Sequence, residues 1–259
     1  MRDKIKDKEY FEKFLTEKNE LITSNENAIL SGEVAESKVE RVKFRNFGFR
    51  LESLVAKYSK GDSIESLKES FSEIIKRMPD ESAPINTKVK KRVGKETVYL
   101  DQYMVEPYER MLRLLSLAYL LDVSDADFKT VFGVIDRDNI RDNLYEFIIK
   151  ARFPDRIQAG EEEYDSKSVI LKVYKNLRET ATENDLPEAA KHVGKFLKKD
   201  FYHKNTGFYD FHKSKINLYY GYWSFESAAI SAIKGVNDSN FRDNEYYPKD
   251  LVDYYRSKK

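Results

Sequence analysis

Two short groups of residues have the types and order needed for nuclease chemistry: Pro154-Asp155 and, further along the chain, Asp165-Ser166-Lys167. In metal-dependent nucleases, this pattern places two carboxylates on a divalent ion and a lysine beside the attacking water. Such a site requires adjoining β-strands, whereas Asp155 follows a strongly helical segment and only residues 169–173 have the composition of a strand. Because a short motif needs its structural context, we expect a loop and a helix start here.

A second acidic group, Asp136, Asp138 and Asp142, has part of the carboxylate spacing of a calcium-binding loop. The EF-hand loop needs glycine at its sixth position and glutamate at its twelfth. This chain has Arg141 and Phe147 at those positions. We therefore expect a solvated helix start and no calcium site.

Histidine-based chemistry is not indicated either. The three histidines, His192, His203 and His212, lack the spacing of a metal site and the serine or acid partners of a catalytic triad. The chain also has no glycine-rich loop for phosphate. The sequence therefore predicts a protein that is not an enzyme, with no catalytic residue, no metal and no cofactor.

Two basic groups raise the question of nucleic-acid binding. A helical regulator that binds nucleic acid would use Lys38, Arg41 and Arg45 together with the basic run Lys88 to Lys95. However, 46 Lys and Arg face 45 Asp and Glu, and neither half of the chain has the basic excess of a dedicated nucleic-acid binder. This regulator and a metal-dependent nuclease are kept as alternative functions.

Helical periodicity dominates the 259 residues, because apolar residues recur three or four positions apart and alternating stretches are scarce. Only 10 Gly and 6 Pro interrupt the chain, and hydrophobic residues make up 41% of it. These features predict an all-α protein with few or no strands and a sizeable core. We expect two packed helical domains, 1–122 and 123–259, because the most apolar helix ends near Leu121 in a polar turn.

Several helices can be placed from their stripes and caps. An apolar stripe runs over residues 47–58, and the spacing of Asp62 and Glu65 predicts a capping box that opens the next helix. Residues 111–121 are apolar on nearly all sides, which predicts a central buried helix.

The remaining chain gives further expectations. Asp185 should cap a helix with Pro187 in its first turn. A later helix is expected over 214–234, and loops are expected at 79–97 and 153–166 because prolines and charge runs gather there.

One glutamate, Glu226, lies in a segment that holds the only Trp and several of the 18 Tyr. In the expected helix it borders the apolar stripe, one turn from Tyr222 and Ile230. A carboxylate in that position needs hydrogen-bond partners, and acid–base catalysis usually needs a second group. We expect Glu226 to act as a structural clamp.

The C-terminal segments around this glutamate resemble a known family. Tyr220-Gly221-Tyr222-Trp223-Ser224-Phe225-Glu226, Asp238-Ser239 and Tyr246-Tyr247-Pro248-Lys249-Asp250-Leu251 are similar to the C-terminal domain of the PoNi-type immunity proteins. That name stands for polymorphic nuclease effector immunity. Tyr58 to Asp62 and Leu115 to Ala118 resemble the first domain of the same family, so the resemblance covers nearly the whole chain.

The resemblance implies an all-helical, two-domain protein that binds and neutralises a cognate antibacterial DNase toxin. Such toxins are delivered between bacteria by specialised secretion systems, and the immunity protein has no enzymatic role. The motif residues expected to be structural are Tyr220, Gly221, Trp223, Glu226, Asp238, Tyr247, Pro248 and Asp250.

The expected contact with the toxin follows from charge. A DNase groove must be basic to hold phosphates, so a protein that blocks the DNA-binding or active site should present carboxylates to it. Exposed aromatic side chains should supply most of the affinity. The residues expected to contact the toxin are Glu161, Glu162, Glu163, Asp165, Phe208, Tyr209, Asp238, Asp243 and Glu245.

The expected location is the cytoplasm. The chain has no cysteine, its first residues are highly charged, and its longest apolar run, 114–121, is too short to span a bilayer. We therefore expect a protein partner, no direct contact with nucleic acid and no membrane. The aromatic content leaves a homodimer open.

Overall fold

The computed structural model describes residues 1–82, 87–156 and 172–259, with the backbone alone at 87–91, 93, 98 and 100. The chain forms two compact units. Unit 1 consists of Met1–Pro84 and Asp210–Tyr222, and unit 2 consists of Ile85–Tyr209 and Trp223–Lys259. The predicted all-α class is confirmed, because helices make up most of the described residues and the strands there form a single hairpin.

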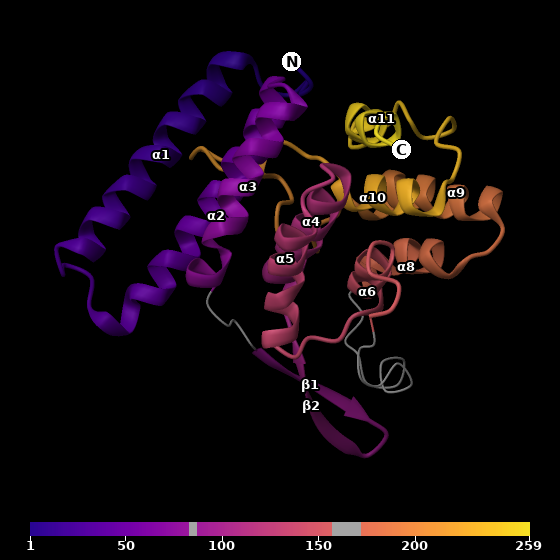
Figure 1. Ribbon diagram of the computed structural model, residues 1–259, viewed down its shortest axis with the longest axis horizontal. Coiled ribbons are helices and arrows are strands. Elements are labelled where there is room, and N and C mark those ends of the chain that lie inside the picture. Colours follow the sequence, from indigo (N-terminus) through magenta and orange to yellow (C-terminus); the bar gives the residue numbers. More distant parts are fainter. Residues whose placement is uncertain (83–86, 157–171) are drawn as a thin grey trace. The chain divides into compact units, whose positions relative to one another are not determined.

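Unit 1 is built on three long helices, α1 (Lys8–Leu30), α2 (Glu36–Lys60) and α3 (Ile64–Glu81), and α2 packs against both others (Figure 1). The predicted stripe over 47–58 is confirmed, since Phe47, Leu51 and Val55 are buried. The predicted capping box is wrong by one residue. The hydroxyl of Ser63 accepts from the amide of Ser66 at 3.2 Å and caps α3, whereas Asp62 precedes the cap.

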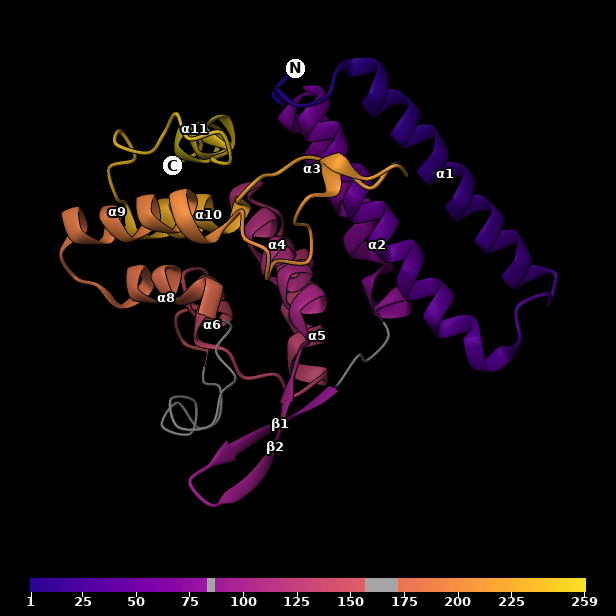
Figure 2. The ribbon, with the colours of Figure 1, turned by 180° about the vertical axis from the view of Figure 1, so that it is seen from behind.

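The segment 210–222 belongs to unit 1, where it lies beside the long helices (Figure 2). It includes a short helical turn, Phe211–Lys213. The hydroxyl of Tyr10 donates to the carbonyl of Tyr219 at 3.0 Å, and the hydroxyl of Ser59 donates to the carbonyl of Tyr220 at 2.8 Å. The helix expected over 214–234 is therefore wrong in its first half. Gly221 has a φ of +115°, a conformation that no helix contains.

Unit 2 surrounds α4 (Val105–Leu120), which contacts α5, α6, α10 and α11. The prediction of a buried helix over 111–121 is confirmed, because nearly every residue of this stretch is buried. The other helices of the unit are α5 (Asp125–Arg137), α6 (Asn143–Lys150), α8 (Lys175–Thr182), α9 (Leu186–Lys195), α10 (Phe225–Lys234) and α11 (Lys249–Ser257), with short turns at Lys172–Tyr174 and Phe196–Asp200. Asp185 caps α9 and Pro187 lies in its first turn, as predicted.

Residues 87–102 form an antiparallel hairpin, β1 (Thr87–Val93) and β2 (Glu96–Gln102), which projects from the helices of unit 2 (Figure 1). The loop expected at 79–97 is therefore wrong, since its first residues end α3 and most of the rest joins the hairpin. Gly94 has a φ of +61°, which suits a two-residue turn. The lysines of β1 conceal the alternation of apolar and polar residues that would signal a strand.

The predicted division of the chain into 1–122 and 123–259 stays a prediction. The position lies between α4 and α5, and both helices belong to unit 2. The two units are instead connected near Pro84, and again on either side of the segment 210–222.

Gly61 ends α2 with a φ of +105°, and a Cβ added there would lie 2.9 Å from the backbone nitrogen of Met1. Gly133 lies inside α5, and a Cβ there would meet nothing within 4 Å. We predict that Gly61→Ala lowers the free energy of unfolding by about 1–2 kcal/mol, because the backbone conformation disfavours a side chain. Gly133→Ala should raise it by about 0.5–1 kcal/mol.

Urea unfolding followed by circular dichroism checks both substitutions. If Gly61→Ala is as stable as the wild type, the close approach of the N-terminal segment to the end of α2 does not hold.

Candidate functional site

Three tyrosines form a cluster on unit 2, two of them from the loop after Asp200 and the third from the turn before α11. The ring centroid of Tyr202 lies 4.9 Å from that of Tyr209 and 5.9 Å from that of Tyr246. The side chain of Tyr209 is 39% exposed, and Tyr202 and Tyr246 are half-buried. We call these three residues the tyrosine patch. Tyrosine is enriched where proteins bind one another, because it presents a large amphipathic surface and loses little conformational entropy.

Two buried phenylalanines lie beneath the tyrosine patch. Phe201 and Phe208, each adjacent in sequence to a patch tyrosine, are buried with ring centroids 5.1 Å apart. Phe201 also lies 5.2 Å from Tyr246. Of the two neighbouring aromatics expected to contact the toxin, the structure therefore places Phe208 in the core and Tyr209 at the surface.

The loop that carries Tyr209 is held by a buried carboxylate on α4. The amide of Gly207 donates to both oxygens of Glu109, at 3.2 and 3.1 Å. A Cβ at Gly207 would lie 2.9 Å from one of these oxygens, so a side chain there would require the carboxylate to shift. Within the loop, the amide and hydroxyl of Thr206 donate to the carbonyl of His203. Glu109 thus positions the surface loop from the core helix.

Two exposed carboxylates, Asp243 and Glu245, precede Tyr246 in the chain, and we call them the acidic edge. Asp243 pairs with Lys249 at 2.6 Å. The turn that carries them is fixed, because the amide of Ser224 donates to the carbonyl of Tyr246 at 2.8 Å. Both residues of the acidic edge were predicted as toxin contacts, and the structure exposes both.

Asp238 has a different role, although it was predicted both as a toxin contact and as a structural residue. It is buried and accepts hydrogen bonds from Arg242 at 3.1 Å, from Arg256 at 3.0 Å and from the Tyr247 hydroxyl at 3.2 Å. All these partners lie in unit 2, so the carboxylate holds the turn before Tyr246 against α11.

The other motif residues are also largely internal. Tyr220, Gly221, Trp223, Tyr247 and Pro248 are buried, and Asp250 is half-buried in the first turn of α11. The motif therefore divides between the units, with Tyr220 in unit 1 and Trp223 in unit 2.

Glu226 is only 5% exposed, in the first turn of α10. Burial raises its pKa to about 7, against the smaller opposing effects of hydrogen bonds to its own backbone amide and to Ser224 and of the charge on Arg113. Burial also raises the pKa of Glu109 to about 7, with Arg113 and the amide of Gly207 lowering it and the charge of Glu226 raising it. The two carboxyl groups thus titrate in one electrostatic environment.

Sequence reasoning identified Glu226 but missed Glu109. The available signal was the position of Glu109 at the start of the largely apolar stretch of this helix, four residues before Arg113 on the same face. Such a pair inside a buried helix needs a partner from another segment.

The acidic residues that resembled a calcium loop have three separate partners. Asp136 pairs with Arg156 at 2.5 Å, and Asp138 accepts from the Tyr103 hydroxyl at 2.6 Å. Asp142 caps α6 and pairs with Arg178 at 2.6 Å. Among the described residues, no group of three or more His, Asp or Glu side chains is arranged to hold a metal ion.

The nuclease-like pattern is only partly visible. Asp155 lies exposed in the turn after α6. Its expected companions, Asp165 and Lys167, lie outside the described residues, as do the predicted toxin contacts Glu161, Glu162 and Glu163.

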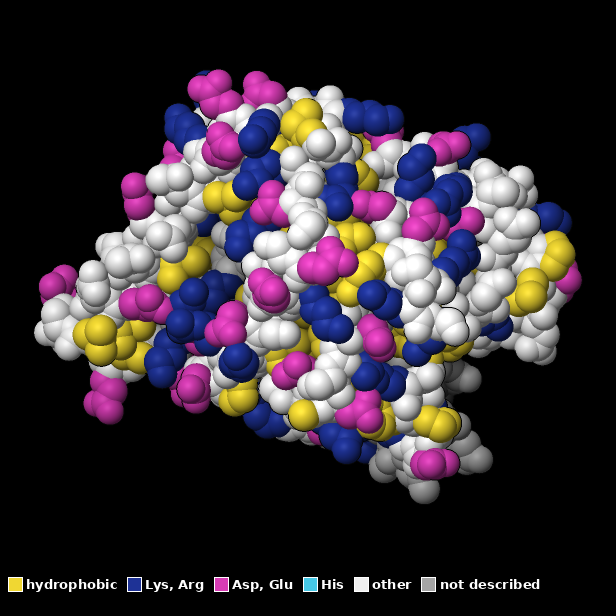
Figure 3. All heavy atoms as spheres, turned by 45° about the horizontal axis from the view of Figure 1, so that its top comes forward, with side chains coloured by type: hydrophobic (Ala, Val, Ile, Leu, Met, Phe, Trp, Pro, Cys, Tyr) yellow, Lys and Arg dark blue, Asp and Glu magenta, His cyan; other side chains and the backbone are white. Residues whose placement is uncertain are grey.

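The described surface mixes both signs of charge. On the face drawn in Figure 3, Lys and Arg side chains alternate with Asp and Glu, and neither sign forms a continuous field. On this face, the net charge of +1 is therefore not gathered into a field of one sign.

Two family models match the sequence and together span nearly all of it. The model described as PoNe immunity protein (PoNi), N-terminal, matches residues 2–132, and the model described as PoNe immunity proteins (PoNi), C-terminal, matches residues 140–251. The chain belongs to the PoNe immunity protein family. It is accordingly an immunity protein that binds and neutralises a polymorphic nuclease toxin, and the resemblance in the C-terminal motif is confirmed.

A solved structure supports the fold of this family member. The crystal structure of protein PA2201 from Pseudomonas aeruginosa matches with a TM-score of 0.62 and 15% sequence identity, covering 96% of this chain and 88% of that one. At this identity the likeness concerns the fold alone. No curated protein matches the sequence. Within the described part of the chain, no helix combines the length and the apolar character needed to cross a membrane.

The raised pKa of Glu226 gives a prediction for stability. Between about pH 4.5 and 7 the folded protein binds a proton that the unfolded chain has lost, so the free energy of unfolding falls as the pH rises through this window. The fall amounts to about 3 kcal/mol for one such group. Glu226→Gln should remove it, so the variant should lose less stability than the wild type between pH 5 and pH 8.

Urea unfolding can be followed by the fluorescence of Trp223, the only tryptophan, which lies in unit 2. Glu12→Gln, an exposed change on α1, serves as the control. Parallel pH profiles for Glu226→Gln and the wild type would contradict the assignment of this carboxyl group.

Proposed function

We propose that this protein neutralises its DNase toxin by covering the toxin's DNA-binding surface with the tyrosine patch and the acidic edge. The observation that carries the proposal is the placement of exposed Tyr209, on a loop anchored to α4, against Tyr202, which in turn packs on Tyr246, the residue that follows the exposed carboxylates. Both the aromatic and the acidic component were expected from the sequence, and they come together at Tyr246.

The chemistry of the two partners is complementary. A DNase must hold DNA phosphates in a basic groove, and carboxylates presented to that groove speed association and favour the correct orientation. The tyrosines would supply most of the affinity, because large side chains at the centre of an interface carry a disproportionate share of the binding energy. Their fixed position reduces the entropy lost on binding.

Inhibition by coverage requires no reaction in the immunity protein, so we propose a purely protein-binding role, without cofactor, metal, membrane or direct nucleic-acid contact. Self-protection from a DNase is needed where the DNA lies, which places the protein in the cytoplasm of the producing cell. The acidic run Glu161 to Glu163, with Asp165, remains part of the proposed toxin-binding surface on its charge alone.

The regulator that binds nucleic acid is less well supported. Its residues Lys38, Arg41 and Arg45 lie exposed on α2 of unit 1, whereas the basic run Lys88 to Lys95 belongs to the hairpin of unit 2. The basic residues thus divide between separate compact units, and each group by itself is small.

Tyr209→Ala should weaken binding of the toxin by about 10- to 100-fold, mainly through faster dissociation, because it removes an aromatic side chain from the centre of the proposed interface. The matched control is Tyr99→Ala, which removes a tyrosine that is 61% exposed on the hairpin of the same unit. Surface plasmon resonance with the nuclease domain of the toxin provides both rates. Equal effects of the two substitutions would remove the tyrosine patch from the interface.

The acidic edge should act mainly on association. The double variant Asp243→Lys, Glu245→Lys is expected to slow association about tenfold at low salt and to have a smaller effect at high salt, because exposed charges are screened. The control Glu12→Lys, Glu20→Lys makes the same charge change at exposed positions of α1. If both variants slow association equally, the effect belongs to net charge, and the acidic edge has no specific role.

A further inference from the structure

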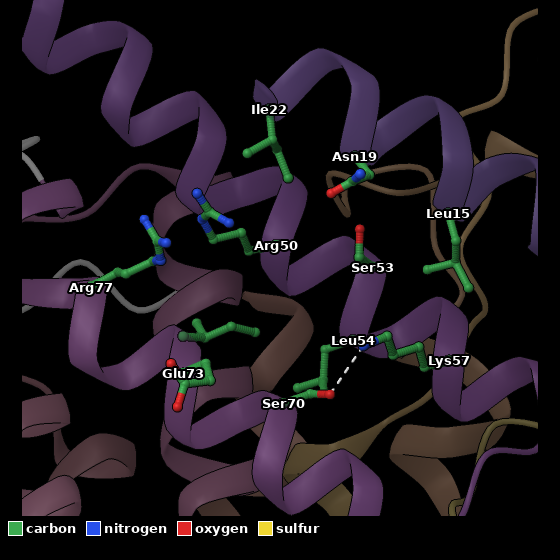
Figure 4. A pocket seen from close by; sticks show the side chains of 11 residues that line it. Leu15, Asn19, Ile22, Arg50, Ser53, Leu54, Lys57, Ser70, Glu73 and Arg77 are labelled. Carbon is green, nitrogen blue, oxygen red and sulfur yellow. Dashed lines mark hydrogen bonds between the residues drawn. The ribbon is translucent and has the colours of Figure 1, made fainter. Parts of the chain in front are cut away.

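Unit 1 contains a groove that the proposed tyrosine interface does not use. It lies along α2, between α1 and α3, and has a volume of about 420 Å³ (Figure 4). Its lining residues recur three or four positions apart on each helix, so one face of every helix contributes. These residues are Leu15, Asn19 and Ile22 of α1, Arg50, Ser53, Leu54 and Lys57 of α2, and Ser70, Glu73, Ile74 and Arg77 of α3.

Two of the three cations in the groove are already neutralised. Arg50 pairs with Glu26 at 2.5 Å and with Glu81 at 3.3 Å. Arg77 pairs with the same two carboxylates, at 3.3 and 3.4 Å. These ion pairs cross-link the three helices at one end of the groove, and their charges are balanced within unit 1.

Lys57 differs from the two arginines. Its half-buried ammonium group donates to the hydroxyl of Ser70 at 3.0 Å, the contact drawn as a dashed line in Figure 4. Within the described ranges, no carboxylate lies within 4 Å of it. An ammonium group has three donors, and a half-buried cation gains most from an anionic partner. Lys57 is therefore the position in the groove with capacity for a carboxylate.

The surroundings of Lys57 define the rest of the ligand. Leu54 and Ile74 contribute apolar side chains to the lining. Ser53 and Asn19, labelled in Figure 4, contribute a hydroxyl and an amide. A volume of this size accommodates a few side chains. The groove thus suits a short segment in which a carboxylate stands beside an apolar side chain.

We propose that this groove is a second contact site for the toxin and binds an acidic, partly apolar segment outside the toxin's DNA-binding surface. The inference rests on the proposed function, because the toxin is its partner. Every DNase needs a basic groove for phosphates, so a surface complementary to that groove distinguishes poorly between toxins. Selectivity for one toxin requires contacts to features that DNA binding does not fix. An acidic segment is such a feature, and the ammonium group of Lys57 can pair with its carboxylate.

The experiment is isothermal titration of the immunity protein with the nuclease domain of its toxin. Lys57→Glu should weaken binding at least about tenfold, because the new glutamate would then face the carboxylate of the toxin segment. Lys57→Gln should have an intermediate effect, because it removes the positive charge without adding a negative one. Lys13→Glu is the matched control, since it makes the same charge change on an exposed side chain of α1 that does not line the groove. Thermal melting verifies that each variant is folded.

Ser70→Ala provides a second variant, because it removes the internal partner of Lys57 and leaves the ammonium group in place. It should bind the toxin no more weakly than the wild type. Equal affinities of Lys57→Glu and Lys13→Glu would overturn the inference while the wild type still binds and Tyr209→Ala still weakens binding. A wild type that does not bind the toxin at all would instead refute the proposed function.

Discussion

The hydrogen bonds between the Glu109 carboxylate and the Gly207 amide connect the core helix of unit 2 to its most distinctive surface feature. Burying a carboxylate is costly, and the raised pKa of Glu109 reflects that cost. The amide of Gly207 and the charge of Arg113 offset part of it. Without this link, the loop that carries Tyr209 would lose its hydrogen bonds to the core helix. The surface site therefore depends on an interaction in the interior.

Where sequence patterns are long and periodic, they predicted the fold correctly. The stripe of α2 and the buried character of α4 extend over several turns, and Asp185 with Pro187 gives α9 a specific start. The failures concern short or local features. Gly221 interrupts the helix that the sequence predicted over 214–234, and the lysines of β1 hide the pattern of a strand.

The candidate site was harder to predict than the fold. Tyr209 and the acidic edge were identified from residue type, but loops have no periodicity that distinguishes an inward Phe208 from an outward Tyr209. The association of Tyr202, Tyr209 and Tyr246 depends on tertiary structure, as does the contact between Glu109 and Gly207. Asp238 was predicted both as a toxin contact and as a structural residue, because the sequence does not show whether a side chain is buried. In the structure, Asp238 is buried and pairs with Arg242 and Arg256.

The composition of unit 1 from Met1–Pro84 and Asp210–Tyr222 has a consequence for synthesis. Asp3, in the first of these two segments, accepts a hydrogen bond from the hydroxyl of Tyr219, in the second, which is synthesised later. At bacterial elongation rates, the interval between Pro84 and Tyr222 lasts on the order of ten seconds. During that time the three long helices exist without the segment that completes them, and their apolar faces are open to chaperones and proteases. In a cell that already contains the toxin, unit 1 of the immunity protein is therefore completed only after the segment 210–222 has been synthesised.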